Sequence, residues 1–199
     1  MVHNNWLCVR LYVLVRGQRD NVIEVSVSMK NILLLLYYLL LQHIPMQPIP
    51  GYKCGYKLRY WCVKRLLRSC GRDVIVKDHC YFGNGARLSV GDRSQLGSNA
   101  RLNGNITIGK DVLMGPDVVM MATSHDFSRL DIPINLQGSK SESPIVIGDD
   151  CWIGTRAIVL PGVHLGKQCI VAAGAVVTRC FPDRCILGGV PARLIRMRE

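Results

Sequence analysis

The sequence lacks features that mark several other classes of protein. None of its nine cysteines sits in a CxxC or other metal-type spacing, so we expect reduced thiols in a cytoplasmic protein. The apolar stretch from Asn31 to Ile44 is too short to span a bilayer. No small-residue cleavage site follows it, so we expect no signal peptide. Because 49% of the residues are hydrophobic and only 20% are charged, disorder is not expected over most of the chain.

Acidic residues are scarce at the front of the chain. Between Met1 and Arg72 eleven basic residues accompany two acidic ones, a local charge of +9. The remaining 127 residues carry fourteen basic and twelve acidic residues, a charge of only +2. The basicity therefore belongs to the front segment. Nucleic acid would fit the charge, but no nucleic-acid-binding module is recognisable, so we expect no such partner.

A repeat of six residues runs from about Val76 to Thr178. Aliphatic side chains recur at every sixth position in two registers: Val90, Leu96, Leu102, Ile108, Met114 and Met120, then Ile147, Ile153, Val159, Leu165, Val171 and Val177. Glycine directly follows many of these residues, and a small or β-branched residue usually stands four positions after them. Such self-similarity is the signature of a solenoid.

The hexad pattern predicts an all-β fold, a parallel β-helix. Each unit forms a short strand and a tight bend, and three units close one triangular coil. The aliphatic residue points inward, the small residue fits where the interior narrows, and we expect the glycine to let the backbone turn sharply. Cys80, Cys151 and Cys169 occupy the small position, which predicts a packing role for them.

The repeat is interrupted once, and its limits divide the chain. Met120 and Ile147 are 27 residues apart, which is not a multiple of six, so residues 121–144 are expected to protrude as a loop. Long loops in compact domains are often functional. We therefore expect a β-helix domain at residues 73–199 and a basic helical segment at residues 29–72. Residues 1–28 show no convincing periodicity, and we expect them to be disordered or a spurious extension.

The C-terminal hexads resemble a known family. The motif-bearing stretch reads IGDDCWIGTRAIVLPGVHLGKQCIVAAGAVVTRCFPDRCILGGVPARLIR. It is similar to the hexapeptide-repeat O-acetyltransferases, which include galactoside, maltose and nodulation-factor enzymes and those of capsular and exopolysaccharide assembly. The similarity covers roughly residues 75–197. It implies a left-handed β-helix, a homotrimer, and acetyl-CoA lying in the groove between two prisms.

Within that resemblance, two residues match positions at the reacting centre. His125, in ATSHDF, matches the catalytic histidine of the loop, and imidazole suits a base that takes a proton from a sugar hydroxyl. Asp126 and Phe127 follow where relatives commonly have proline, so the resemblance does not define the acceptor pocket. Asn99, in LGSNAR, matches an asparagine that binds the acceptor or the reacting carbonyl region. The alternative for Asn99 is a residue suited to a coil bend.

The resemblance also implies a cofactor path. Trp152 matches an aromatic residue that flanks the pantetheine end of acetyl-CoA. Thr155, Ala173, Thr178 and Arg179 match positions along the pantetheine and pyrophosphate. Arg193 and Arg196, in VPARLIR, match basic residues near the adenosine phosphates, where guanidinium groups suit phosphate oxygens. A surface tryptophan and solvated arginines are the alternatives. No metal is implied. The γ-type carbonic anhydrases, which share this fold, bind zinc through three histidines, two of them close in sequence. Here no second histidine lies near His125, and Leu130 stands five residues later.

We therefore expect an acetyltransferase that moves an acetyl group from acetyl-CoA to a hydroxyl of a sugar or polysaccharide precursor. Two alternatives stay open: a transferase for another small acceptor (an amine, a serine or an antibiotic) and a non-catalytic trimeric scaffold at the membrane. Residues 31–72, in which basic and aromatic residues interleave, suit peripheral contact with the inner face of the membrane. The alternative for this segment is a pair of helices packed against the base of the trimer.

Overall fold

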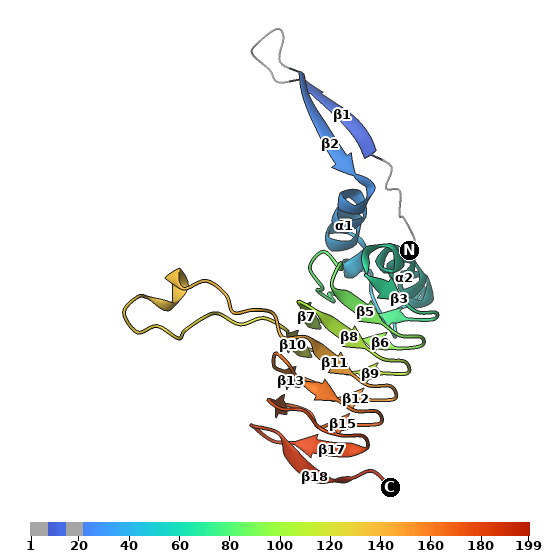
Figure 1. The fold of residues 1–199 in the computed structure, drawn as a ribbon. Helices are drawn as coiled ribbons and strands as arrows, with labels where there is room; N and C mark the ends of the chain where they lie inside the picture. The colour runs from blue at the N-terminus through green and yellow to red at the C-terminus, as the bar shows by residue number, and fades with distance from the viewer. Residues whose placement is uncertain (1–7, 15–21) are drawn as a thin grey trace.

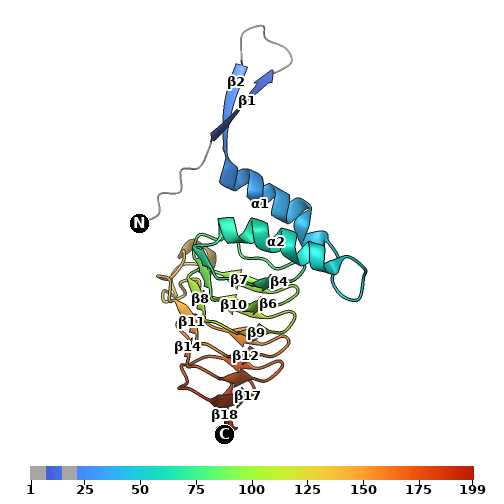
Figure 2. The same cartoon turned by 90° about the vertical axis from the view of Figure 1, so that its right-hand side faces the viewer.

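The computed structural model describes residues 8–14 and 22–199, with side chains from Ser28 onward. Its main body is a left-handed parallel β-helix with a helical segment before it, so the predicted fold class is confirmed (Figure 1). The β-helix stands as a prism with the helices at one end and the C-terminus at the other (Figure 2).

Three parallel sheets form the faces of the prism. The first contains β3 (Ser69–Cys70), β5 (Leu88–Val90), β8 (Ile106–Ile108), β11 (Ile145–Ile147) and β14 (His164–Leu165). The second contains β9 (Leu113–Met114), β12 (Trp152–Ile153), β15 (Ile170–Val171) and β17 (Cys185–Gly188), and the antiparallel β18 (Arg193–Met197) ends it. The third contains β7 (Arg101–Asn103), β10 (Val119–Met121), β13 (Ile158–Val159) and β16 (Val176–Val177). A separate pair, β4 (Ile75–Val76) and β6 (Gln95–Leu96), precedes the second sheet in the first two coils.

The repeat positions fill the interior of the prism. The aliphatic hexad residues are buried from Val90 to Val177, and the small positions between them are buried as well. Cys151, Cys169 and Cys185 form a ladder of buried thiols through successive coils. The eight cysteines whose side chains are described are all free thiols. Since no single coil can bury its own apolar face, the coils stabilise one another cooperatively.

The glycines after the aliphatic residues have a different role from the one expected. A Cβ on Gly97 would lie 1.9 Å from the carbonyl oxygen of Gly115 in the next coil. Glycine is thus required for close stacking of coils, and the left-handed backbone falls two residues later, at Asn99 with φ 54° and at Asp117 with φ 57°. Asparagine and aspartate tolerate this conformation better than most residues.

Two helices close the N-terminal end of the prism. They are α1 (Met29–Leu39), followed by the short 3-10 helix η1 (Leu41–His43), and α2 (Tyr52–Leu66). Tyr37 of α1 is fully buried, and its hydroxyl donates to the carbonyl oxygen of Cys80 over 2.7 Å. Arg59 of α2 is also fully buried and donates to the carbonyl oxygens of Val76, Leu41 and Ile44. These contacts cover the apolar end of the solenoid, as a terminal cap must.

Two further strands precede the helices. β1 (Cys8–Leu14) and β2 (Val22–Ser28) pair antiparallel as a hairpin beyond α1. Residues 1–7 and 15–21 lie outside the described residues, and the expectation that residues 1–28 are disordered or a spurious extension stays a prediction. In the part of the chain that the structure describes, no helix is long and apolar enough to cross a membrane.

Candidate active site

A long arm carries His125 away from the prism. It leaves at the end of β10, returns at β11 and projects sideways (Figure 1). Its two limbs pair antiparallel: His125 faces Ser139, Asp126 N–H donates to Gly138 O over 3.1 Å, and Lys140 N–H donates to Ser124 O over 2.9 Å. His125 thus projects, exposed, from a paired stem.

The stem is fixed to the body of the prism by Glu142. One carboxylate oxygen of Glu142 accepts from the Asn105 N–H over 2.5 Å, and the other accepts from Arg87 over 2.7 Å. The Ser143 N–H donates to Ala122 O, which joins the two limbs at their base. Beside the histidine, the Ser128 N–H donates to the Asp126 carboxylate and lowers the pKa of that carboxyl.

A column of corners carries several predicted site residues. It runs along the edge between the second and third faces, where hydrogen bonds from Asp117 to Ser98, Arg156 to Pro116 and Gly174 to Thr155 join successive coils. The structure therefore places three predicted residues, Asn99, Thr155 and Ala173, on this one edge. The side-chain amide of Asn99 donates to Asp117 over 3.1 Å, and Arg156 lies 3.7 Å from the same carboxylate.

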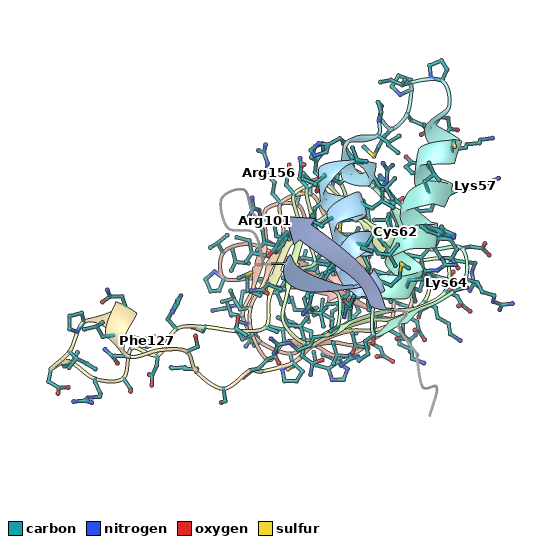
Figure 3. The ribbon with its side chains drawn as sticks, turned by 90° about the horizontal axis from the view of Figure 1, so that it is seen from above. Lys57, Cys62, Lys64, Arg101, Phe127 and Arg156 are labelled. Carbon is teal, nitrogen blue, oxygen red and sulfur yellow. The ribbon has the colours of Figure 1, made fainter. Side chains whose placement is uncertain are left out.

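A groove of about 600 Å³ opens beside the N-terminal part of this column. Its lining is aromatic and polar: Tyr38, Gln42, His79, Tyr81, Asn99, Arg101, Asp117 and Val119. Figure 3 shows Arg101 and Arg156 on the same side of the prism. No motif of the sequence marks His79 as a residue of this groove. Its contact with His43, 3.1 Å between ring nitrogens, depends on how η1 packs against the first coil.

The predicted cofactor residues fall into two groups. Trp152 lies half exposed on the second face, and Arg193 and Arg196 lie on β18 of the same sheet. Thr178 and Arg179 follow β16 and so lie at the opposite end of the third face from Thr155 and Ala173. His164 is exposed on β14.

His125 and Asn99 are not brought together within one chain. Asn99 precedes β7 and His125 follows β10, at opposite ends of the third face, and no residue of the arm lines the groove. Among the described residues there is no cluster of three or more His, Cys, Asp or Glu side chains that could hold a metal ion.

Comparisons with known proteins agree with this fold. A family model described as "Hexapeptide repeat of succinyl-transferase" matches residues 144–179. The Saccharomyces cerevisiae protein named "Putative acetyltransferase YJL218W" is 32% identical over 136 residues, which are 67% of this chain and 68% of that protein. A Staphylococcus aureus 2,3,4,5-tetrahydropyridine-2,6-dicarboxylate N-acetyltransferase is 48% identical over 56 residues, but these are only 28% of this chain and 23% of that enzyme.

Two solved structures carry bound cofactor. The Vibrio cholerae hexapeptide-repeat acetyltransferase VCA0836, complexed with acetyl-CoA, superposes with a TM-score of 0.67 at 26% identity and covers 86% of this chain and 90% of its own. A galactoside acetyltransferase complexed with coenzyme A gives a TM-score of 0.65 at 27% identity, with 80% and 78% covered. The left-handed β-helix, its hexads and these relatives define a class of acyl-group transferases. The chain belongs to the hexapeptide-repeat acetyltransferase family.

Proposed function

We propose that this protein transfers an acetyl group from acetyl-CoA to a hydroxyl of a sugar or polysaccharide precursor, with His125 as the general base. The observation that carries the proposal is the placement of His125, exposed on a paired stem that Glu142 fixes to the prism. A catalytic base must be held in a defined position, and a paired stem does this better than a free loop.

The proposed reaction is a direct transfer within a ternary complex. The imidazole of His125 takes the proton of the acceptor hydroxyl as that oxygen attacks the thioester carbonyl carbon. The carbon–sulfur bond then breaks, and the departing sulfur takes the proton from the imidazolium, which gives CoA thiol and the acetyl ester. Backbone N–H groups are suited to stabilising the oxyanion between these steps.

We assign the acceptor to the groove beside Asn99. Tyr81, which is 45% exposed, offers an aromatic face to the apolar side of a sugar ring. Asn99, Arg101 and Asp117 offer donors and acceptors for hydroxyl groups. A small number of polar groups on an aromatic wall is the usual composition of a specific ligand site.

We assign acetyl-CoA to the edge that carries Thr155 and Ala173 and to the second face beside it, where Trp152 lies. The half-exposed indole of Trp152 suits the apolar pantetheine, and Arg193 and Arg196 at the C-terminal end of the same sheet suit phosphates. In the two neighbours described above the bound molecules are acetyl-CoA and coenzyme A. We assign Thr178 and Arg179 to a neighbouring chain's contribution, because they lie at the other end of the third face.

We also propose a trimer whose sites lie between chains. Four apolar side chains at the tip of the arm are exposed in the single chain: Phe127, Leu130, Ile134 and Leu136, with Leu130 100% exposed. Exposed apolar clusters of this kind mark contact surfaces. An arm that packs on a neighbouring prism would bring His125 of one chain toward the groove of the next.

An amine acceptor is the second candidate, because the Staphylococcus aureus relative is an N-acetyltransferase. A screen of sugars against amino compounds, with CoA thiol release as the readout, separates the two. Release that depends on a sugar and falls about a hundredfold in His125→Ala supports the proposal. Undiminished release in the variant would remove His125 from the mechanism. Absence of both turnover and acetyl-CoA binding by calorimetry would favour a non-catalytic scaffold.

A further inference from the structure

The helical cap has an outer surface that the fold does not use. The inner sides of α1 and α2 are buried, with Leu33, Tyr37, Cys62, Val63 and Leu66 in the core. Five large apolar side chains remain exposed on the outside: Leu35 (56%), Leu39 (66%), Leu40 (61%), Leu58 (41%) and Trp61 (46%). The outer ends of solenoids are normally polar, so an apolar surface at this end indicates an interaction site.

The same cap carries a one-signed charge. Residues 29–72 contain eight Lys and Arg and no Asp or Glu. Lys53, Lys57, Lys64 and Arg65 are exposed along α2, and the Arg65 guanidinium lies 4.4 Å from the centre of the Trp61 ring. Figure 3 shows Lys57 and Lys64 directed to the same side of α2, away from α1 and clear of the β1–β2 hairpin. We call these cations and the five apolar side chains above the cap surface.

We propose that the cap surface binds the surface of an anionic lipid bilayer. Cations beside leucine and tryptophan match the layered chemistry of such a surface, with headgroup phosphates outside and acyl chains beneath. The helices α1 and α2, with 11 and 15 residues, lie along the end of the prism and do not cross a bilayer, so the contact is interfacial.

Charge complementarity decides between this occupant and two others. A second copy of the cap surface would set Lys57 and Lys64 against cations of the same kind, which repels. Nucleic acid would satisfy the lysines but would leave Leu35, Leu39 and Leu40 in contact with water or phosphate. A bilayer with anionic headgroups satisfies both the charged and the apolar parts.

Vesicle flotation with the full chain tests the proposal. We expect binding to vesicles of phosphatidylcholine with phosphatidylglycerol, little binding to phosphatidylcholine alone, and a strong decrease in 0.5 M salt. The triple variant K53E/K57E/K64E should bind the anionic vesicles about a hundredfold more weakly, since each basic residue contributes several-fold. The matched variant K110E/K167E/R184E changes the same charge on the prism and should bind like the wild type.

A second pair of variants tests the apolar part. L35Q/L39Q keeps every charge and should weaken binding about tenfold or more, because it removes two side chains that would enter the acyl region. Equal binding to both vesicle types, equal loss in the two charge variants, or tighter binding to duplex DNA than to vesicles would overturn the proposal. Transfer to a soluble acceptor should be unchanged in K53E/K57E/K64E, and His125→Ala should bind vesicles normally, so this test is independent of the proposed reaction.

Discussion

Gly97 shows how a single residue sets the spacing of coils. An alanine there would place its Cβ 1.9 Å from Gly115 O, so two coils would have to separate. We expect Gly97→Ala to lower the free energy of unfolding by at least about 3 kcal/mol. Gly83 is the matched control: its φ is +59° and a Cβ there meets nothing within 4 Å, so alanine should cost only about 1 kcal/mol. Urea unfolding followed by circular dichroism compares them, and equal losses would contradict the close-approach argument.

The cysteines differ in reactivity for reasons that the structure makes plain. Burial raises the pKa of the Cys80 thiol to about 12 and that of Cys62 to about 11, so neither forms the reactive thiolate at pH 8. Cys54 and Cys180 are exposed. We expect iodoacetamide to label these two within minutes in the native protein and to reach Cys62 and Cys80 only after unfolding. Mass spectrometry of the peptides reads this directly, and early labelling of Cys80 would show that the cap opens.

The hexad positions could be predicted from the sequence because each aliphatic side chain repeats in the same environment. Leu96, Met114 and Ile153 all stack in one interior column, and the period alone assigns them inward. The left-handed residue two positions after each glycine could not be predicted so simply, since a cation (Arg93), an amide (Asn99) and a carboxylate (Asp111) all stand there. The burial of Arg59 was also out of reach, because its partners are backbone carbonyls of η1 and the first coil.

At the scale of elements, the position of the arm depends on a clamp, which is the pair of hydrogen bonds that Glu142 accepts from the prism. Glu142 receives hydrogen bonds from the Asn105 N–H and Arg87 and so fixes the limb opposite His125. We expect Glu142→Ala to lower kcat by about ten- to a hundredfold, because a displacement near 1 Å is enough for such a loss. The KM for acetyl-CoA should change little, since its proposed residues lie on the prism.

Two further variants separate positioning from general damage. Glu142→Gln keeps an acceptor for Asn105 and should retain most of the activity. Limited proteolysis within residues 121–144 should accelerate in Glu142→Ala and not in Glu142→Gln. Loss of acetyl-CoA binding together with kcat in Glu142→Ala would point to a damaged fold, and an unchanged kcat would show that the clamp does not position His125.

The six-residue period predicted where the arm begins and ends, but it did not predict that the two limbs of the arm pair as an antiparallel stem. Met120, the last hexad residue before the break, lies in the middle of β10, and Ile147, where the hexads resume, is the last residue of β11. The antiparallel stem left no sequence signal, because the pairing of Ser124 with Lys140 uses backbone groups that any residue supplies.

At the scale of the whole molecule, the separation of His125 from Asn99 predicts that an active site needs two chains. Mixed trimers of His125→Ala and Asn99→Gly test this, since glycine keeps the φ of 54° while removing the amide. Each pure variant should lose most of its activity. In a random mixture, a site draws an intact histidine from one chain half of the time and an intact asparagine from its neighbour half of the time. About a quarter of the wild-type activity should therefore return.

The control for that experiment is a mixture of His125→Ala with the double variant His125→Ala/Asn99→Gly, in which no site can hold an intact histidine. Native mass spectrometry must show that chains have exchanged in both mixtures. Activity that returns only in the first mixture places the two side chains on different chains of one site. If exchanged trimers stay inactive, His125 and Asn99 serve the same chain, and the arm must fold back across its own third face to reach the groove.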